Sequence, residues 1–280
     1  MRLPDFHIHP DVWLVMAAVW GAYLAAVRRH RAVAEPGEGP QTRRRTVLFS
    51  AGVLVLWLAA GWPVHDLAED YLYSVHMLQH LLFSLVAAPL LVSGVPPWML
   101  RRLLAPRPVG VVFAFLTRPL VAIVVFNGVL LFTHWPAVVE ASVRSEPIHL
   151  GLHLLVVGSA LVMWWPVLSS LPELPALRAP AQMLYLFIQS LAPTIPAAFL
   201  TFGEQTLYPI YATFPRIWGI DPLTDQLIAG LIMKLGGGLI LWAVIATVFF
   251  RWFGQEQRGG WDALDFWSAE SDIRAGLRRR

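Results

Sequence analysis

Long apolar runs separated by short polar connections dominate the chain. An α-helix needs about 20 mostly apolar residues to cross a membrane. Seven runs approach that length, at 12–27, 46–62, 72–95, 118–136, 147–168, 181–202 and 224–250. These runs are continuous, whereas transmembrane β-strands alternate over short segments. We therefore predict an all-α polytopic membrane protein with seven transmembrane helices.

The ends of these runs suggest how the chain is organised. Arg118 and Pro119 interrupt the pattern before the fourth run. Because proline favours the start of a helix, the stretch 108–117 is predicted to be a separate interfacial segment. We expect the transmembrane domain to occupy 1–252, and the polar tail 253–280 to be interfacial or disordered.

Composition excludes several other classes of protein. Of the 280 residues, 57% are hydrophobic and 14% are charged, against about 25% charged residues in a soluble domain. The chain therefore has too few polar residues for a soluble enzyme or a disordered chain. It contains no cysteine, which excludes a disulfide-stapled domain, a thiolate metal site and c-type haem attachment. Its basic residues are too dispersed to predict nucleic-acid binding.

The arginines predict the orientation in the membrane, because basic residues accumulate on the cytoplasmic side. With the N-terminus outside, seventeen of the twenty arginines lie inside, and only Arg2, Arg144 and Arg216 lie outside. The first run has no basic n-region, because Asp5 and Asp11 precede it and arginines follow it, so we interpret it as a retained span and not a cleaved signal peptide. The C-terminus is then cytoplasmic.

Eight of the nine histidines fall outside or in the outer half of the membrane in this topology; only His30 is cytoplasmic. His76 and His80 share one face of the third span at a spacing of four residues. His149 and His153 repeat the spacing on the fifth span, and His134 ends the fourth. A lone histidine near a helix end is usually an interfacial amphipath. Two pairs at matching depth instead favour a metal site, since imidazole is the commonest metal ligand.

The other side chains available narrow the choice of metal. Imidazole suits copper, zinc, iron and nickel, and thioethers such as those of Met77 and Met163 favour Cu(I). We therefore expect copper. Gln79, Asp225 and Gln226 are expected as outer partners that orient the rings, although helix capping and helix–helix hydrogen bonds are the simpler roles for such residues.

One cation lies within an apolar run. Lys234 falls near the middle of the last span, and we predict that it faces the bundle interior and is neutral or paired. Asp225 is about 13.5 Å away along the helix, too far for direct pairing. The glycines 236–238 would let a neighbouring helix come close.

Several motifs resemble those of the bacterial caa-type cytochrome c oxidase assembly factors. His76-Met77-Leu78-Gln79-His80 with Pro89-Leu90 resembles the first family signature, and His134-Trp135-Pro136 the second. His149 and His153 with Trp164-Trp165-Pro166 resemble the next helix. Asp225-Gln226 with Ala229-Gly230 and Met233 resembles the last. The resemblance covers about 46–250 in order and spacing, and only Lys234 departs from it.

The resemblance implies a multi-pass protein of the bacterial plasma membrane that helps to mature cytochrome c oxidase by supplying copper. The implied metal positions are His76, His80, His134, His149 and His153, and the implied partners are oxidase subunits, the lipid bilayer and an external copper donor. His7, His9 and His65 match no family motif. The expected role is that of a non-enzymatic chaperone.

Three other functions stay open. A membrane zinc hydrolase needs a general base, and the third to fifth spans contain no acid, which leaves Asp225 as the nearest candidate. A haem protein could use histidines from facing helices as axial ligands. A retinal protein needs a carboxylate counter-ion near the lysine, and the third span offers none.

Overall fold

The computed structural model describes residues 6–31 and 39–277, and the side chains of 6–30 and 41–258. This part of the chain is helical and contains no strand. The first half comprises α1 (Pro10–Arg31), α2 (Gly39–Ala59), α3 (Val64–Asp70), α4 (Tyr73–Leu81), the π-helical η1 (Leu82–Ala87), α5 (Ala88–Gly94), α6 (Pro97–Leu103) and α7 (Arg107–Leu116).

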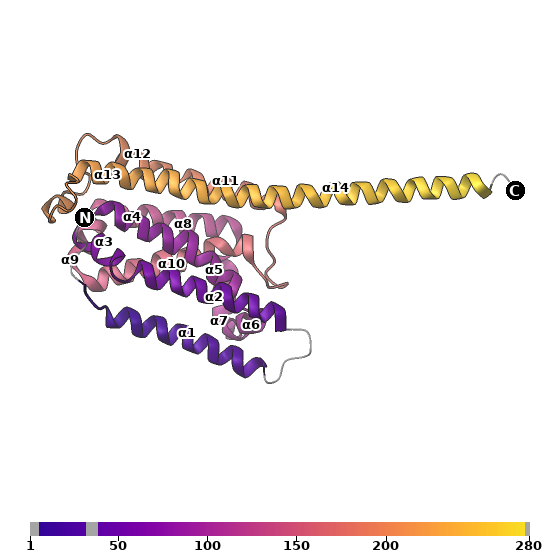
Figure 1. The fold of residues 1–280 in the computed structure, drawn as a ribbon, viewed down its shortest axis with the longest axis horizontal. Helices are drawn as coiled ribbons and strands as arrows, with labels where there is room; N and C mark the ends of the chain where they lie inside the picture. The colour runs from indigo at the N-terminus through magenta and orange to yellow at the C-terminus, as the bar shows by residue number, and fades with distance from the viewer. Residues whose placement is uncertain (1–5, 32–38, 278–280) are drawn as a thin grey trace.

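The second half continues the bundle, and Figure 1 shows its long helices lying alongside those of the first half. It comprises α8 (Pro119–Thr133), α9 (Pro136–Arg144), α10 (Glu146–Leu168), α11 (Ala179–Leu191), α12 (Thr194–Phe202), the 3-10 helix η2 (Pro209–Thr213), α13 (Pro222–Leu231), the π-helical η3 (Ile232–Gly236) and α14 (Gly237–Leu277).

Five helical segments in the described residues are long and apolar enough to cross a membrane, and seven are if two bent pairs each count as one span. The first pair bends by 41° between α2 and α3, and the second by 82° between α7 and α8. The second bend lies at Arg118–Pro119, where the sequence predicts a break. The other five segments correspond to the remaining predicted runs.

Proline marks many of the helix starts, including those of α6 to α11 and of α13. A proline in the first turn loses no helical hydrogen bond, because the first N–H groups have no partner within the helix. These prolines divide the long apolar runs into straight segments with defined turns between them.

Close contacts between α1, α2 and α5 stabilise the half of the bundle that lies opposite the predicted histidine site. Gly94 lies against the backbone of Phe49, so that α5 packs tightly on α2. The Arg45 guanidinium donates to the carbonyls of Ser93 and Val95 and satisfies the end of α5. Stacking of Tyr23 on Phe49, with ring centroids 3.8 Å apart, attaches α1 to the same surface.

A second set of buried side chains centres on α10. The Trp164 indole N–H donates to the Ser84 carbonyl of η1 over 2.8 Å, and the Tyr185 hydroxyl donates to the Met163 carbonyl. Met163, one of the two expected thioether ligands, belongs to this apolar core. It does not line the cavity beside the histidines.

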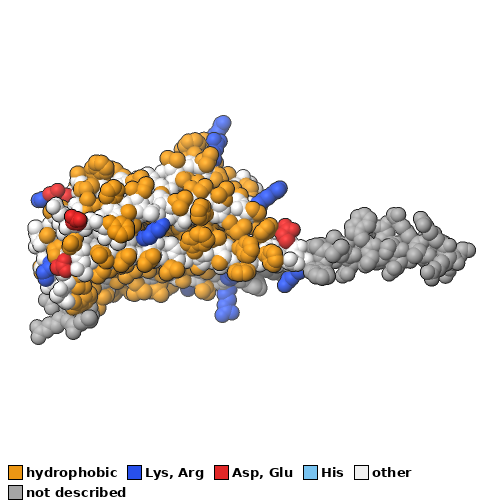
Figure 2. Space-filling model, turned by 90° about the horizontal axis from the view of Figure 1, so that it is seen from above, with side chains coloured by type: hydrophobic (Ala, Val, Ile, Leu, Met, Phe, Trp, Pro, Cys, Tyr) orange, Lys and Arg blue, Asp and Glu red, His pale blue; other side chains and the backbone are white. Residues whose placement is uncertain are grey.

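The outside of the bundle is apolar. Figure 2 shows hydrophobic side chains spread over the whole viewed face, and Leu14, Leu120 and Leu239 are each more than 70% exposed. Large apolar side chains are seldom exposed in such numbers on a water-facing surface, and they suit contact with lipid. Past the bundle, the backbone of α14 continues as helix to Leu277. The predicted nature of the tail 253–280 stays a prediction.

Candidate metal centre

The structure brings together all five histidines predicted as ligands. His76 and His80 lie on α4, His149 and His153 on α10, and His134 follows the last residue of α8. The ring centroids within the two pairs are 4.3 and 4.1 Å apart. The ring centroid of His80 lies 5.2 Å from that of His153 and 6.3 Å from that of His134. The spacing of four residues places each pair on one helix face, and the packing of the helices turns the two faces toward each other.

Three of these imidazoles form a compact group. One ring nitrogen from each of His76, His149 and His153 lies within 4.8 Å of the other two. His76 and His149 are buried, and His153 is half-buried. Small rotations of the rings would let these nitrogens converge on one ion, because metal–nitrogen bonds of about 2.0–2.1 Å place two ligand atoms roughly 3–4 Å apart.

The hydrogen bonding of the cluster fits a metal site. Within the described residues, His76 Nδ1 and the Nε2 atoms of His80, His134 and His153 are buried and have no hydrogen-bond partner. A buried polar atom without a partner costs about 1–3 kcal/mol. Several such atoms facing one another are explained if they bind an ion together.

The His134 ring is held in a form suited to coordination. Its Nδ1 lies 2.7 Å from the Leu130 carbonyl oxygen, so Nδ1 donates the proton and Nε2 keeps its lone pair. The Tyr208 hydroxyl donates to the His134 carbonyl over 2.8 Å. Burial raises the pKa of Tyr208 to about 12, so that this hydroxyl stays protonated and remains a donor.

A second group, which the sequence did not predict, adjoins the first and consists of His65 and Glu69 of α3 with His149 of α10. His65 Nε2 and His149 Nε2 lie 3.0 and 2.9 Å from the same Glu69 oxygen, Oε1. The His149 contact is a close approach without the alignment of a hydrogen bond. Ligand atoms of the three residues lie within 4.8 Å of one another. His149 therefore belongs to both groups.

The N-terminal segment closes against this outer group. The Asp66 carboxylate accepts from His7 and His9 at 3.1 and 3.0 Å, and the His9 ring lies 4.7 Å from that of His65. These three histidines match no family motif. His65 and Glu69 are four residues apart and therefore share one face of α3. This spacing could have indicated the group, but only if a helix had been predicted over these residues.

The residues expected to orient the five clustered histidines bond mainly to backbone groups around the cluster and not to the rings of those five histidines. The buried Asp225 carboxylate accepts from the backbone N–H groups of Tyr73 and Ser74 at 2.7 and 3.0 Å, which fixes the start of α4. The Gln79 amide donates to the Ala59 carbonyl and lies 3.4 Å from His65 Nδ1. Gln226 accepts from Leu207 N–H over 2.5 Å and anchors the loop before α13.

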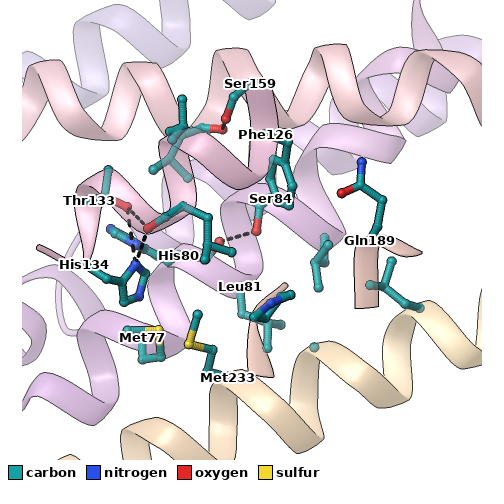
Figure 3. A pocket seen from close by; sticks show the side chains of 17 residues that line it. Met77, His80, Leu81, Ser84, Phe126, Thr133, His134, Ser159, Gln189 and Met233 are labelled. Carbon is teal, nitrogen blue, oxygen red and sulfur yellow. Dashed lines mark hydrogen bonds between the residues drawn. The ribbon is translucent and has the colours of Figure 1, made fainter. Parts of the chain in front are cut away.

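A cavity of about 80 Å³ opens beside His80 and His134. Met77, on α4, and Met233, on η3, also line it, and Figure 3 shows their sulfur atoms on the side of the cavity nearest His134. Ser84 lies further along the same cavity, where its hydroxyl donates to the His80 carbonyl. The histidine cluster is therefore continuous with a space that holds two thioethers.

Comparison with known proteins places the chain in a family. The model of the cytochrome c oxidase caa3 assembly factor family matches residues 21–255. Two similar relatives are the uncharacterized proteins Mb0105 of Mycobacterium bovis and MT0111 of Mycobacterium tuberculosis, each 25% identical over 271 residues. The match covers 88% of this chain but only 38% of those relatives. No solved structure matches. The chain belongs to the cytochrome c oxidase caa3 assembly factor family.

Proposed function

We propose that this protein binds copper through its clustered histidines and delivers it to a nascent subunit of cytochrome c oxidase. The observation that carries the proposal is the group of buried ring nitrogens on α4, α10 and the end of α8 that have no hydrogen-bond partner among the described residues. The family supplies the oxidase as the target. The chemistry of imidazole, with thioethers beside it, supports copper as the cargo.

The proposed site lies in the outer half of the bacterial plasma membrane. The topology has seven spans, with the N-terminus outside and the C-terminus in the cytoplasm, and rests on the distribution of arginines. Because the chain contains no cysteine, single cysteines report topology cleanly. A cysteine replacing the exposed Glu204 should label from outside, and one replacing Arg101 only from inside. The reverse pattern would put the histidines on the cytoplasmic side and remove them from an external copper donor.

The shared ligand His149 suggests how an ion moves. The group of His65, Glu69 and His149 contains a carboxylate and adjoins the N-terminal segment, whereas the group of His76, His149 and His153 contains imidazoles alone. An ion accepted from an external donor at the first group can exchange ligands stepwise into the second. Transfer of this kind needs neighbouring ligands and no covalent chemistry, so the proposed role is not enzymatic.

A zinc-dependent membrane hydrolase is the second candidate, and one observation favours it. Glu69 places a carboxylate oxygen 2.9 Å from a ligand atom of His149, where it could act as a general base beside a metal-bound water. Hydrolysis should then depend on Zn²⁺ and fall with Glu69→Gln. A haem group fits less well, because a cavity of about 80 Å³ is small against the 300–1,000 Å³ typical of pockets for small molecules.

The proposal is tested by separate removal of His80 and His153. Each alanine variant should bind less copper per protein and support less active oxidase, while its own level in the membrane stays normal. His30→Phe is the control. It keeps an aromatic ring stacked on Trp98, where the centroids are now 4.1 Å apart, and it should change neither readout.

Added copper separates a weakened site from a misfolded protein. Excess copper in the medium should partly restore oxidase activity in the His80 and His153 variants by mass action, but it cannot restore a protein that fails to fold. Normal copper content and normal oxidase activity in both variants would contradict the proposal.

A further inference from the structure

His76, His149 and His153 form the imidazole group. The cavity next to it contains a further set of atoms that can bind a metal. His80 and His134 line it together with Met77 and Met233. These four residues come from α4, the end of α8 and η3, so the site exists only in the folded bundle. His80 and His134 offer imidazole nitrogens, and Met77 and Met233 offer thioether sulfurs.

Both imidazoles of this set are ready to bind. His134 is 9% exposed, and its Nδ1 proton is directed to the Leu130 carbonyl, which leaves Nε2 as a lone-pair donor. The Nε2 atom of His80 is likewise buried and without a partner among the described residues. Their ring centroids are 6.3 Å apart. With metal–nitrogen bonds of about 2.0 Å, two rings at this centroid separation can share one ion.

The sulfurs lie on the side of the cavity where such an ion would need further ligands. Met77 and Met233 belong to one buried cluster, at 3% and 7% exposed, and Figure 3 shows them beside the His134 ring. Met233 lies in the π-helical η3. Wider turns of this type often occur at functional sites.

We propose a second metal site, formed by His80, His134, Met77 and Met233, that selects Cu(I). Thioethers are soft ligands that favour Cu(I) over divalent ions, whereas the group of His76, His149 and His153 offers imidazole alone. The inference rests on the proposed function and extends it. Cu(I) held at the imidazole group would move one helical turn along α4, from His76 to His80, without a change of oxidation state, into a site that disfavours Zn²⁺.

Copper K-edge X-ray absorption of the full-length protein in detergent, loaded anaerobically with Cu(I), is the first test. The wild-type spectrum should contain a copper–sulfur scattering shell, and the Met77→Leu/Met233→Leu double variant should lack it. Titration against a chromophoric Cu(I) chelator should show the double variant losing about one Cu(I) per chain, while its Zn²⁺ binding is unchanged.

The matched control is Met163→Leu, which alters a buried methionine in the core cluster of α10 away from the cavity. It should keep both the sulfur shell and the full Cu(I) content. A wild-type spectrum with nitrogen ligands alone would overturn this inference, whatever the folding of the variants, and would leave the proposed copper function standing. Failure of the wild-type protein to bind any copper would instead defeat the proposed function itself.

Discussion

His149 Nε2 lies 2.9 Å from Glu69 Oε1, a contact that joins α10 to the short helix α3. The same carboxylate oxygen lies 3.0 Å from His65, and the His149 ring lies 5.6 Å from that of His76. His149 therefore connects a carboxylate-containing group near the N-terminal segment with the imidazole group inside the bundle. A negative charge at this point favours the approach of a cation and holds the His149 ring in place.

Glu69→Gln should weaken the binding of divalent ions. The amide keeps the size of the side chain but removes its charge. Because Glu69 is one of the three ligand residues of its group, we expect the affinity for Cu²⁺ and Zn²⁺ to fall at least by the roughly 10–100-fold that the loss of a supporting carboxylate costs. Binding of Cu(I) at the proposed site of His80 and His134, deeper in the bundle, should be affected less. Metal titration by calorimetry in detergent measures both.

Glu140→Gln is the control for that variant. Glu140 lies on α9 and pairs with Arg144 on the surface at 2.6 Å, and surface pairs contribute little to stability. It should leave metal affinity unchanged. Equal effects of the two substitutions would mean that net charge, and not the contact with His149, controls binding.

Asp225 should matter for the position of α4 rather than for metal directly. Its carboxylate accepts two backbone N–H groups at the start of the helix that carries His76 and His80. Hydrogen bonds to a charged acceptor contribute about 1.5–3 kcal/mol, so Asp225→Ala should lower thermal stability clearly, and copper content should fall with it. Asp225→Asn keeps one acceptor oxygen and should recover part of the stability. A loss of copper without any loss of stability would contradict this role.

Gly94→Ala should disrupt the packing of α5 on α2. A Cβ at this position would lie 2.6 Å from the Phe49 Cα atom, and backbone on both sides cannot move aside cheaply. We expect a loss of roughly 1–3 kcal/mol in unfolding assays in detergent. Gly158→Ala is the control, because nothing lies within 4 Å of a Cβ there and alanine is the better helix former. It should leave stability equal or slightly higher.

Local geometry explains which features the sequence could predict. A spacing of four residues places His76 and His80 on one face of any helix. Pro119 likewise interrupts the helix before it, whatever the helix packs against. The meeting of the two histidine pairs at one depth followed from the lengths of the spans. These properties need only the helical repeat and the direction of each span.

Long-range packing explains what the sequence could not predict. Glu69 follows the bend of 41° before α3 and meets His149 of α10, and no residue pattern specifies that angle. Asp225 reaches Tyr73 across 152 positions of sequence. Asp225 and Gln226 are expected from the sequence to orient the histidine rings, yet the hydrogen bonds of both residues are with backbone atoms. Met233 lines the cavity from a π-helical turn, which the apolar pattern alone does not distinguish from α-helix.

Lys234 presents the last prediction. Its ammonium donates to the Thr194 hydroxyl at the start of α12, and the side chain is half-buried. A Cβ on the nearby Gly236 would lie 3.0 Å from the Leu81 side chain, so α4 does approach closely here. The bond ties η3 to the break between α11 and α12, where Pro193 follows the end of α11.

A double-mutant cycle separates a pairing role from a tolerated solitary lysine. Lys234→Leu should cost about 0.5–1.5 kcal/mol, the net value of one hydrogen bond. Thr194→Val should cost more, because it leaves a half-buried charge without its acceptor. If the two residues act as a pair, the double variant should be no less stable than Thr194→Val alone, since removal of the lysine also removes the unpaired charge. Thermal unfolding in detergent measures all four proteins. Strictly additive losses, or no loss with Lys234→Leu, would mean that the contact contributes nothing to the fold.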